Sequence, residues 1–259
     1  MSTLAAEQVS LRFGNRDAVA GVSLAVAGGE FVALVGPNGA GKTSLLRLLA
    51  GLVRPSEGRV LLDGRPLAAL PPRQRGRRIA FLAPARIAVP AAYRVDEVVA
   101  LARFAHRDWW RTTGRDDPAV ERALGRFELA SLGNRRLGTL SDGERQRVWL
   151  AALEAQDPEI LLLDEPTSHL DVAHVAATLR ALCAWAAAGR AVVAVVHDLD
   201  AALAAADRVV VVRDGGLVLD APAGDLAPSA IGASFDVTLA AAVVARRRRA
   251  LVVDYEVER

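Results

Sequence analysis

Residues 36–44 contain the residue types that hold phosphate groups. The segment reads Gly-Pro-Asn-Gly-Ala-Gly-Lys-Thr-Ser and follows the apolar run Phe31–Val35. Glycines allow successive backbone N–H groups to point inward at an anion, and the start of a following helix adds partial positive charge. The spacing is typical of a phosphate-binding loop, in which Lys42 reaches the β- and γ-phosphates and the Thr43 hydroxyl ligates Mg²⁺. The predicted phosphate-binding residues are Gly36, Asn38, Gly39, Gly41, Lys42, Thr43 and Ser44.

The choice of lysine in this loop is itself informative. Lys42 is the only lysine among the 32 basic residues of the chain, which otherwise carries its positive charge on arginine. An ammonium group is a compact point charge, and a flat guanidinium fork does not replace it in a tight phosphate cradle. This favours a functional loop over a glycine-rich turn with an exposed lysine.

Two adjacent carboxylates end a second apolar run, Ile160–Leu163. Phosphoryl transfer needs a metal ligand and a group that polarises the attacking water, in addition to the phosphate cradle. We expect Asp164 to hold Mg²⁺, through water, and Glu165 to polarise the attacking water. Taken alone, the pair is also consistent with a strand end capped by solvated acids.

The elements that must position these residues alternate between strands and helices. Strand patterns at 9–13, 21–26 and 31–35 precede the loop, and a helix is expected over 42–51. Residues 58–62 and the Asp63-Gly64 turn suggest a hairpin, and 78–82 suggest another strand. Further strands are expected at 160–163 and 191–196, with a helix over 174–188 that stops at Gly189. This alternation implies parallel strands joined by right-handed crossovers.

The middle of the chain differs from this pattern. Residues 95–104 and 118–129 place their apolar side chains at helical spacing, and no convincing strand lies between them. We therefore interpret residues 90–150 as a helical insertion. The tail after Asp225 has no clear assignment from its pattern.

Composition limits the class of protein. The chain has 259 residues, of which 52% are hydrophobic and 24% are charged, so it can bury one large core. Its apolar runs are shorter than the roughly 20 residues that cross a bilayer, and residues 1–10 have no leader pattern. The single cysteine, Cys183, cannot form an internal disulfide, which fits a reducing cytosol, and its alanine-rich surroundings suggest a small buried side chain. The net charge of +2 argues neither for nor against a nucleic-acid partner.

Residues 140–147, Leu-Ser-Asp-Gly-Glu-Arg-Gln-Arg, resemble the signature sequence of ATP-binding cassette proteins. The match to the usual Leu-Ser-Gly-Gly-Gln is partial, because Asp142 and Glu144 are substituted. The resemblance implies that Ser141 and the Gly143 amide contact the γ-phosphate of ATP held by another subunit, which requires a head-to-tail pair. Asp142 is an acid near a triphosphate, so it is doubtful as a direct contact. Ser141 and Glu144 also form a capping-box pattern, and the two interpretations are compatible.

Three further positions match the same family. Residues 168–171 resemble its D-loop, which assigns Asp171 to the nucleotide interface. The sequence Val-Val-His-Asp places His197 where the family contacts the γ-phosphate, and Phe13 has the register of the aromatic residue that stacks on adenine. Without the family, a lone histidine at a strand end and a phenylalanine in a strand are more often structural. The histidines that lack such a setting, to which we assign no chemistry, are His106, His169 and His174.

One family element is missing. The Q-loop should follow the strand at 78–82 with a glutamine that touches Mg²⁺ or the attacking water. This chain reads Ala-Pro-Ala-Arg at 83–86, and no glutamine occurs between Gln74 and Gln146. Water is then expected to complete the metal shell, and hydrolysis is expected to be slower or differently coupled.

The resemblance implies an α/β fold with a P-loop NTPase (RecA-like) core, an antiparallel β-subdomain and an inserted α-helical subdomain. The nucleotide-binding domain is expected over 1–225, with the helical subdomain at about 90–150, and a C-terminal extension over 226–259. Within the family, the sequence is similar to the ATPase subunits of importers for iron–siderophore, haem or cobalamin.

The expected function is therefore ATP hydrolysis coupled to transport, with ATP and Mg²⁺ as cofactors and a homodimer of this domain as the active form. The expected partners are separate transmembrane permease subunits and a substrate-binding protein, at the cytoplasmic face of the membrane, and no nucleic acid. Two alternatives remain: a soluble cassette ATPase that acts on ribosomes or DNA, and a non-catalytic ATP-binding regulatory module. The arginine run at 246–249 could attract phosphates, although a solvated edge of the extension is favoured.

Overall fold

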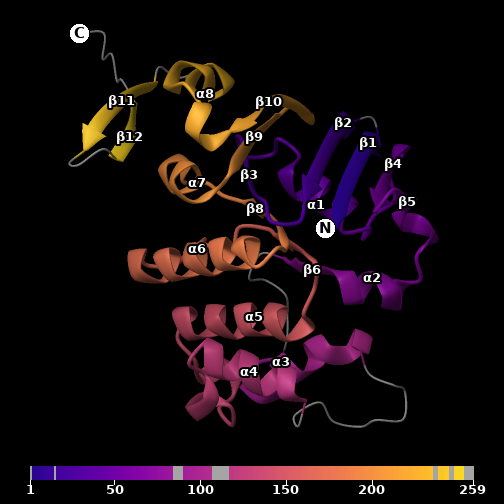
Figure 1. The fold of residues 1–259 in the computed structure, drawn as a ribbon, viewed down its shortest axis with the longest axis vertical. Helices are drawn as coiled ribbons and strands as arrows, with labels where there is room; N and C mark the ends of the chain where they lie inside the picture. The colour runs from indigo at the N-terminus through magenta and orange to yellow at the C-terminus, as the bar shows by residue number, and fades with distance from the viewer. Residues whose placement is uncertain are drawn as a thin grey trace.

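The computed structural model describes residues 2–14, 16–83, 90–106, 117–235, 239–244 and 248–253. Its centre is a 6-stranded sheet with the order β10-β9-β3-β8-β7-β6 (Figure 1). All neighbouring pairs from β9 to β6 are parallel, and β10 pairs antiparallel with β9 at one edge. The strands are β3 (Phe31–Val35), β6 (Ile79–Leu82), β7 (Ile160–Leu163), β8 (Ala191–Val195), β9 (Arg208–Arg213) and β10 (Gly216–Pro222).

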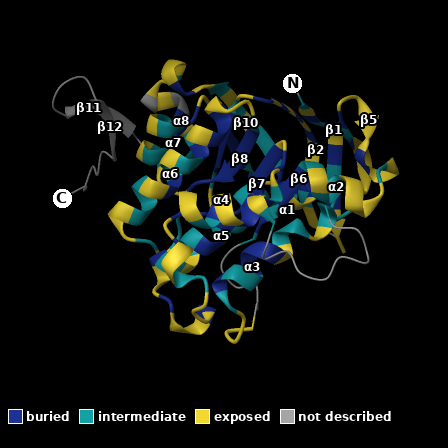
Figure 2. Cartoon of the chain, turned by 60° about the horizontal axis from the view of Figure 1, so that its bottom comes forward, coloured by how far each residue is buried: buried dark blue, intermediate teal, exposed yellow. Residues whose placement is uncertain are grey.

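The central sheet is covered on both faces, which is why its strands read as continuous apolar runs. Every residue of β3, β7 and β8 is buried, as the dark blue strands in Figure 2 show. Alternate residues of β3 enter different cores: Phe31 and Val35 belong to one core cluster, and Val32 and Leu34 belong to the other. The predicted parallel strands are confirmed.

A 4-stranded antiparallel sheet, ordered β2-β1-β4-β5, forms the expected β-subdomain. Its two long strands pair along their length and extend beyond the segments predicted from the sequence. Helix α1 (Lys42–Leu49) buries its leucines in the core that this sheet shares with β3. The strands are β1 (Thr3–Phe13), β2 (Arg16–Ala27), β4 (Glu57–Leu62) and β5 (Arg65–Pro66).

The predicted helical insertion packs as one group below the central sheet in Figure 1. It contains α3 (Val95–Leu101), α4 (Pro118–Arg126) and α5 (Asp142–Gln156), which contact one another. The expected helices at 95–104 and 118–129 are shorter, because α3 gives way to the 3₁₀ turn η2 (Ala102–His106) and α4 ends at Arg126. Short 3₁₀ turns η3 (Ala130–Leu132) and η4 (Leu137–Thr139) lead into α5.

Three of the described helices were not predicted, and the first of them is α2 (Pro72–Arg78), which follows the 3₁₀ turn η1 (Leu67–Ala69). Arg78, the first residue of the expected strand 78–82, ends this helix, and the strand begins at Ile79. Helix α2 buries none of its residues, so its sequence has no apolar periodicity to reveal it. Proline at its start, where a missing N–H costs no hydrogen bond, is the local signal for this helix.

Two further helices pack into the same core cluster as the helical group. They are α6 (Val172–Ala187) and α7 (Leu199–Ala205). The tail continues through η5 (Ala223–Asp225) and α8 (Pro228–Phe235) to a hairpin of β11 (Leu239–Val244) and β12 (Arg248–Val253). Ile231 is fully buried, and Phe235 packs on the core cluster that contains residues of α6. Part of the arginine run at 246–249 lies outside the described residues.

Within the described residues, no helix is both long enough and apolar enough to cross a membrane.

Candidate functional site

The loop between β3 and α1 has the backbone that only glycine adopts easily. Gly36, Gly39 and Gly41 have φ values of +146°, +78° and +104°. A Cβ atom on Gly36 would lie 2.0 Å from the carbonyl oxygen of Val212, and one on Gly41 would lie 2.2 Å from that of Ala18. The loop is therefore pressed against β9 and β2, and its glycines are required by close approach as well as by φ.

The turn between β9 and β10 braces this loop from behind. The Gly215 N–H donates to the Ala40 carbonyl at 3.0 Å, and the Ala20 N–H donates to the Gly215 carbonyl at 2.8 Å. Gly215 thus connects the phosphate-binding loop to β2. The Asp-Gly-Gly sequence at 214–216 signals a turn, but nothing in the sequence indicates that this turn contacts a loop so far away along the chain.

A cavity of about 430 Å³ opens over the loop. Eight of the predicted site residues line it, which brings the phosphate-binding loop, the predicted aromatic and the second carboxylate together. These residues are Phe13, Asn38, Gly39, Gly41, Lys42, Thr43, Ser44 and Glu165.

Lys42 lies at the base of the cavity. Its Nζ donates to the carbonyl oxygens of Gly36 and Pro37, both at 2.8 Å, and its side chain is almost completely buried. Burial lowers the pKa of Lys42, while the carboxylates of Glu165 and Asp164 oppose that shift. The two carbonyls hold the ammonium where phosphate oxygens can replace them as acceptors.

Asp164 fits the ligand set of a divalent cation. Its carboxylate is fully buried, and Oδ1 accepts a hydrogen bond from the Thr43 hydroxyl at 3.1 Å. Within the described part of the chain, Oδ2 has no hydrogen-bond partner although it is shielded from solvent. Burial raises the pKa of Asp164. A buried carboxylate oxygen without a donor is costly unless a cation is bound, and hard oxygen ligands suit Mg²⁺.

Glu165 is held as a carboxylate beside the cavity. Its Oε1 lies 2.8 Å from His197 Nε2, and its Oε2 accepts from the Ser168 hydroxyl at 3.1 Å. The hydrogen bond from His197 is the largest cause that lowers the pKa of Glu165. The backbone of Glu165 is left-handed, with φ of +52°, a strained conformation of the kind that clusters at functional sites.

Phe13 is not a core residue. It ends β1 with 60% of its surface exposed and lines the cavity. Its register partner on β2 is Arg16, which the sequence did not single out. Arg16 also lines the cavity, and a Cβ atom on Gly39 would lie 4.0 Å from its guanidinium. Among so many arginines, no local signal distinguishes this one.

The three residues expected to act on a second subunit do not line this cavity: Ser141, Gly143 and Asp171. Ser141 forms the predicted capping box at the start of α5, since its Oγ accepts from the Glu144 N–H at 3.2 Å and its N–H donates to Glu144 Oε2 at 2.8 Å. Asp171 caps α6 by accepting from the His174 N–H at 2.9 Å.

The doubt about Asp142 has a structural answer. Its carboxylate forms an ion pair with Arg145 one turn along α5, and 73% of its side chain is exposed. The pair partly compensates the acid at the start of this helix. Residues 84–86 of the expected Q-loop segment lie outside the described part of the chain.

The ABC transporter family model matches residues 19–168. Relatives include the hemin import ATP-binding protein HmuV of Pseudomonas entomophila, 40% identical over 89% of this chain and 91% of that protein. The probable siderophore transport system ATP-binding protein YusV of Bacillus subtilis is 37% identical over 83% of this chain and 78% of that protein. A cobalamin import ATP-binding protein, BtuD of Halobacterium salinarum, is 42% identical over 85% and 55%.

Solved structures agree with this assignment. The chain resembles the dimeric ATP-binding cassette MJ0796 in a post-hydrolysis state bound to ADP and Pi, with a TM-score of 0.75 and 26% identity. The likeness covers 85% of this chain and 98% of that one. The phosphate-binding loop, the buried Asp164 and the Glu165–His197 pair occur together on a fold that this family shares. The chain belongs to the ABC transporter family.

Proposed function

We propose that the chain is the ATP-hydrolysing subunit of an ABC transporter. The observation that carries this proposal is the orphaned Oδ2 of Asp164, buried beside Thr43 and next to Glu165 at the edge of a phosphate-binding cavity. Mg²⁺ bound by Thr43 and Asp164 would neutralise charge on the phosphates. Phe13 would stack on adenine, and Lys42 would contact the β- and γ-phosphates.

Glu165 would polarise the attacking water, because its lowered pKa keeps it ionised and its oxygens are already oriented. His197 contacts Glu165, with Nε2 2.8 Å from Oε1. With ATP bound, we expect His197 to contact the γ-phosphate from the same position. The geometry of the pair favours catalysis over the non-catalytic alternative, despite the missing Q-loop glutamine.

The active form that we propose is a head-to-tail homodimer. The cavity over the phosphate-binding loop is lined by none of Ser141, Gly143 and Asp171, so these residues have no nucleotide to contact within their own chain. A second chain would bring them to the γ-phosphate. The dimeric state of MJ0796 is consistent with such an arrangement.

We further propose that the cargo is an iron–siderophore, haem or cobalamin compound, because import proteins for these three classes are among the relatives. Separate permease subunits would span the membrane, and a substrate-binding protein would deliver the cargo. The chain would then act at the cytoplasmic face of the membrane. A soluble cassette ATPase acting on ribosomes or DNA has no observation in its favour.

The test compares the purified chain with Glu165→Gln. We expect the wild type to hydrolyse ATP in the presence of Mg²⁺, and Glu165→Gln to bind ATP and accumulate as an ATP-dependent dimer, measured by light scattering after size exclusion. If neither protein turns over ATP and both stay monomeric with it, the catalytic proposal is wrong for the isolated chain and the non-catalytic module is favoured.

A further inference from the structure

His174 connects two segments that belong to different parts of the fold. It lies in the first turn of α6, where its ring Nδ1 is 2.8 Å from Asp171 Oδ1. The same carboxylate oxygen accepts the backbone N–H of His174 at 2.9 Å. Because a carboxylate only accepts, Nδ1 must carry the proton of this contact. The ring is therefore fixed in orientation by Asp171.

The other edge of the ring rests on the start of α5. A Cβ atom on Gly143 would lie 2.1 Å from His174 Nε2, 2.4 Å from Cδ2 and 2.6 Å from Cε1. These distances are shorter than any real contact of a Cβ atom, so the imidazole occupies the space that a side chain at position 143 would need. A side chain at position 143 would therefore require the His174 ring to move.

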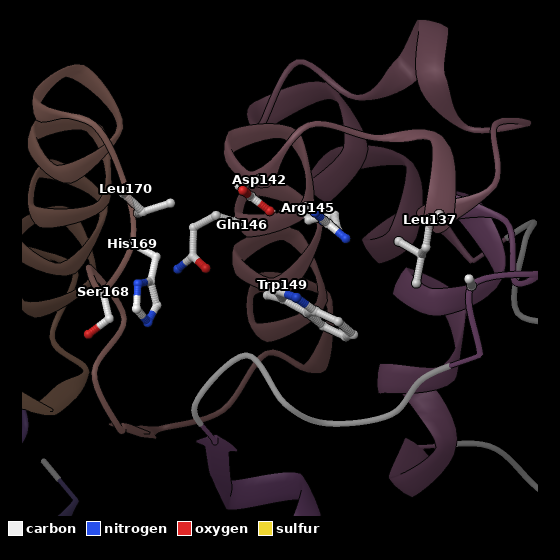
Figure 3. Close-up of a pocket in the computed structure, with 10 residues that line it drawn as sticks. Leu137, Asp142, Arg145, Gln146, Trp149, Ser168, His169 and Leu170 are labelled. Atoms are coloured by element: carbon white, nitrogen blue, oxygen red, sulfur yellow. Dashed lines mark hydrogen bonds and ion pairs between the residues drawn. The ribbon is translucent and has the colours of Figure 1, made fainter.

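Farther along the two helices, α5 and α6 are also joined by a hydrogen bond from Trp185 to Glu154. The Gln146 side chain donates to the Pro166 carbonyl at 2.7 Å. A cavity of about 380 Å³ separates the start of α5 from residues 168–170, with Gln146 and His169 among its walls (Figure 3). Among the described residues, close packing therefore does not fix the separation of these two segments on this side, and the imidazole lies as a spacer between them.

We propose that His174 is a positioning residue that holds Ser141 and Gly143 at a fixed distance from Asp171. One subunit then presents all three groups as a rigid unit to the nucleotide bound by its partner. This inference rests on the proposed dimeric ATPase. It predicts an effect in trans only, because His174 does not line the cavity of its own chain.

The first experiment uses the Glu165→Gln chain, in which the ATP-bound dimer accumulates. Adding His174→Ala should raise the MgATP concentration needed for half-maximal dimerisation by about 10- to 100-fold, the scale on which small misplacements weaken a composite site. The affinity of the monomeric chain for MgATP, measured by titration calorimetry at low protein concentration, should not change. His106→Ala is the matched control, since His106 bonds to the Gln156 carbonyl at the other end of α5.

A conservative variant separates the two contacts of the ring. His174→Asn keeps a donor within reach of Asp171 but is too short to fill the space against Gly143. We expect His174→Asn to impair dimerisation as His174→Ala does. Dimerisation restored by asparagine would show that only the cap of α6 matters and would overturn the proposal.

Mixed chains test the direction of the effect. In a mixture of His174→Ala and Lys42→Ala chains, each heterodimer has one intact composite site. The His174→Ala chain supplies its phosphate-binding loop, and the Lys42→Ala chain supplies His174 on the opposite subunit. The ATP turnover of this mixture should therefore match that of a Ser141→Ala and Lys42→Ala mixture.

Two outcomes overturn the inference while leaving the proposed function intact: unchanged dimerisation of the His174→Ala chain, or a His174→Ala mixture that stays inactive when the Ser141→Ala mixture recovers. If Glu165→Gln alone forms no ATP-dependent dimer, the proposed function itself fails.

Discussion

At the residue scale, the two adjacent carboxylates of the site have pKa values that are shifted in opposite directions. Burial raises the pKa of Asp164, whereas the hydrogen bond from His197 lowers that of Glu165. In the nucleotide-free chain, ionised Asp164 opposes folding and ionised Glu165 supports it. The Asp164 carboxylate is therefore suited to a bound cation, and the Glu165 carboxylate remains ionised.

Asp164→Asn should therefore separate stability from catalysis. A folded-state pKa above the unfolded value means that Asp164 supports folding only at low pH and opposes it as pH rises through the folded pKa. We expect the asparagine to raise the Tm of the metal-free chain at pH 7, and to lower ATP turnover by about 100-fold or more. Thermal unfolding without metal checks the first outcome, and a steady-state ATPase assay with Mg²⁺ checks the second; a lower Tm without the metal would contradict the assignment of Oδ2 as a cation ligand.

Glu165 should show the opposite pH dependence. Its folded pKa is depressed, so its contribution is present above the ordinary value of 4.5 and is lost as pH falls through the folded pKa. Because a third of its side chain is exposed, we expect the wild type to exceed Glu165→Gln by only about 0.5 kcal/mol in unfolding free energy at pH 7. Urea titrations at pH 7 and pH 3.5 should show this difference shrinking at the lower pH.

The sequence predicted the residues whose chemistry is local to one segment. Lys42 and Thr43 occur in a contiguous loop that spacing alone identified, whereas Asp164 and Glu165 end one apolar run and also needed the family resemblance. Arg16, Gly215 and His174 were missed because their importance comes from contacts with distant segments. No property of their own neighbours indicates that they meet a phosphate loop or a helix start.

At the element scale, the same distinction explains the errors in helix and strand bounds. The predicted strand 9–13 is the end of the longer β1, whose apolar alternation changes phase at a bulge near Gln8, where φ is +47°. Helix α2 has no buried face to give it a period. The central strands β3, β7 and β8 were predicted because burial on both faces leaves continuous apolar runs, whereas β9 and β10 were not predicted.

Gly215→Ala tests whether the β9–β10 turn braces the phosphate-binding loop. A left-handed alanine costs about 1–2 kcal/mol, and its Cβ would lie 3.3 Å from the Ala18 carbonyl oxygen. We expect this loss of stability together with weaker MgATP binding. Gly189→Ala is the matched control, because its φ of +89° is similar to the +80° of Gly215 and no atom lies within 4 Å of its added Cβ. Equal effects of both variants on nucleotide affinity would exclude a bracing role.

Gly143→Ala tests the contact between α5 and α6 without any nucleotide. In the wild type its Cβ would overlap the His174 ring, and pushing that ring off its rotamer costs about 0.5–1.5 kcal/mol. In a His174→Ala background the same substitution meets open space and should cost much less. A double-mutant cycle in urea unfolding measures the difference, and additive effects would mean that the two residues are not in contact.

At the scale of the whole molecule, the residues that we expect to act on ATP fall into two groups that lie apart. The cavity over the phosphate-binding loop is lined by Phe13, Lys42 and Thr43, while Ser141 lies outside it at the start of α5. Binding of ATP to a single chain stabilises that chain by an amount set by the ATP concentration alone, whereas a dimer is also stabilised by a higher protein concentration.

The Tm of Glu165→Gln in saturating MgATP should therefore rise with protein concentration. Adding Ser141→Ala should keep the increase in Tm caused by MgATP but abolish its dependence on protein concentration, since only binding to one chain remains. A Tm that still rises with protein concentration after Ser141→Ala would place the subunit interface on another surface of the molecule.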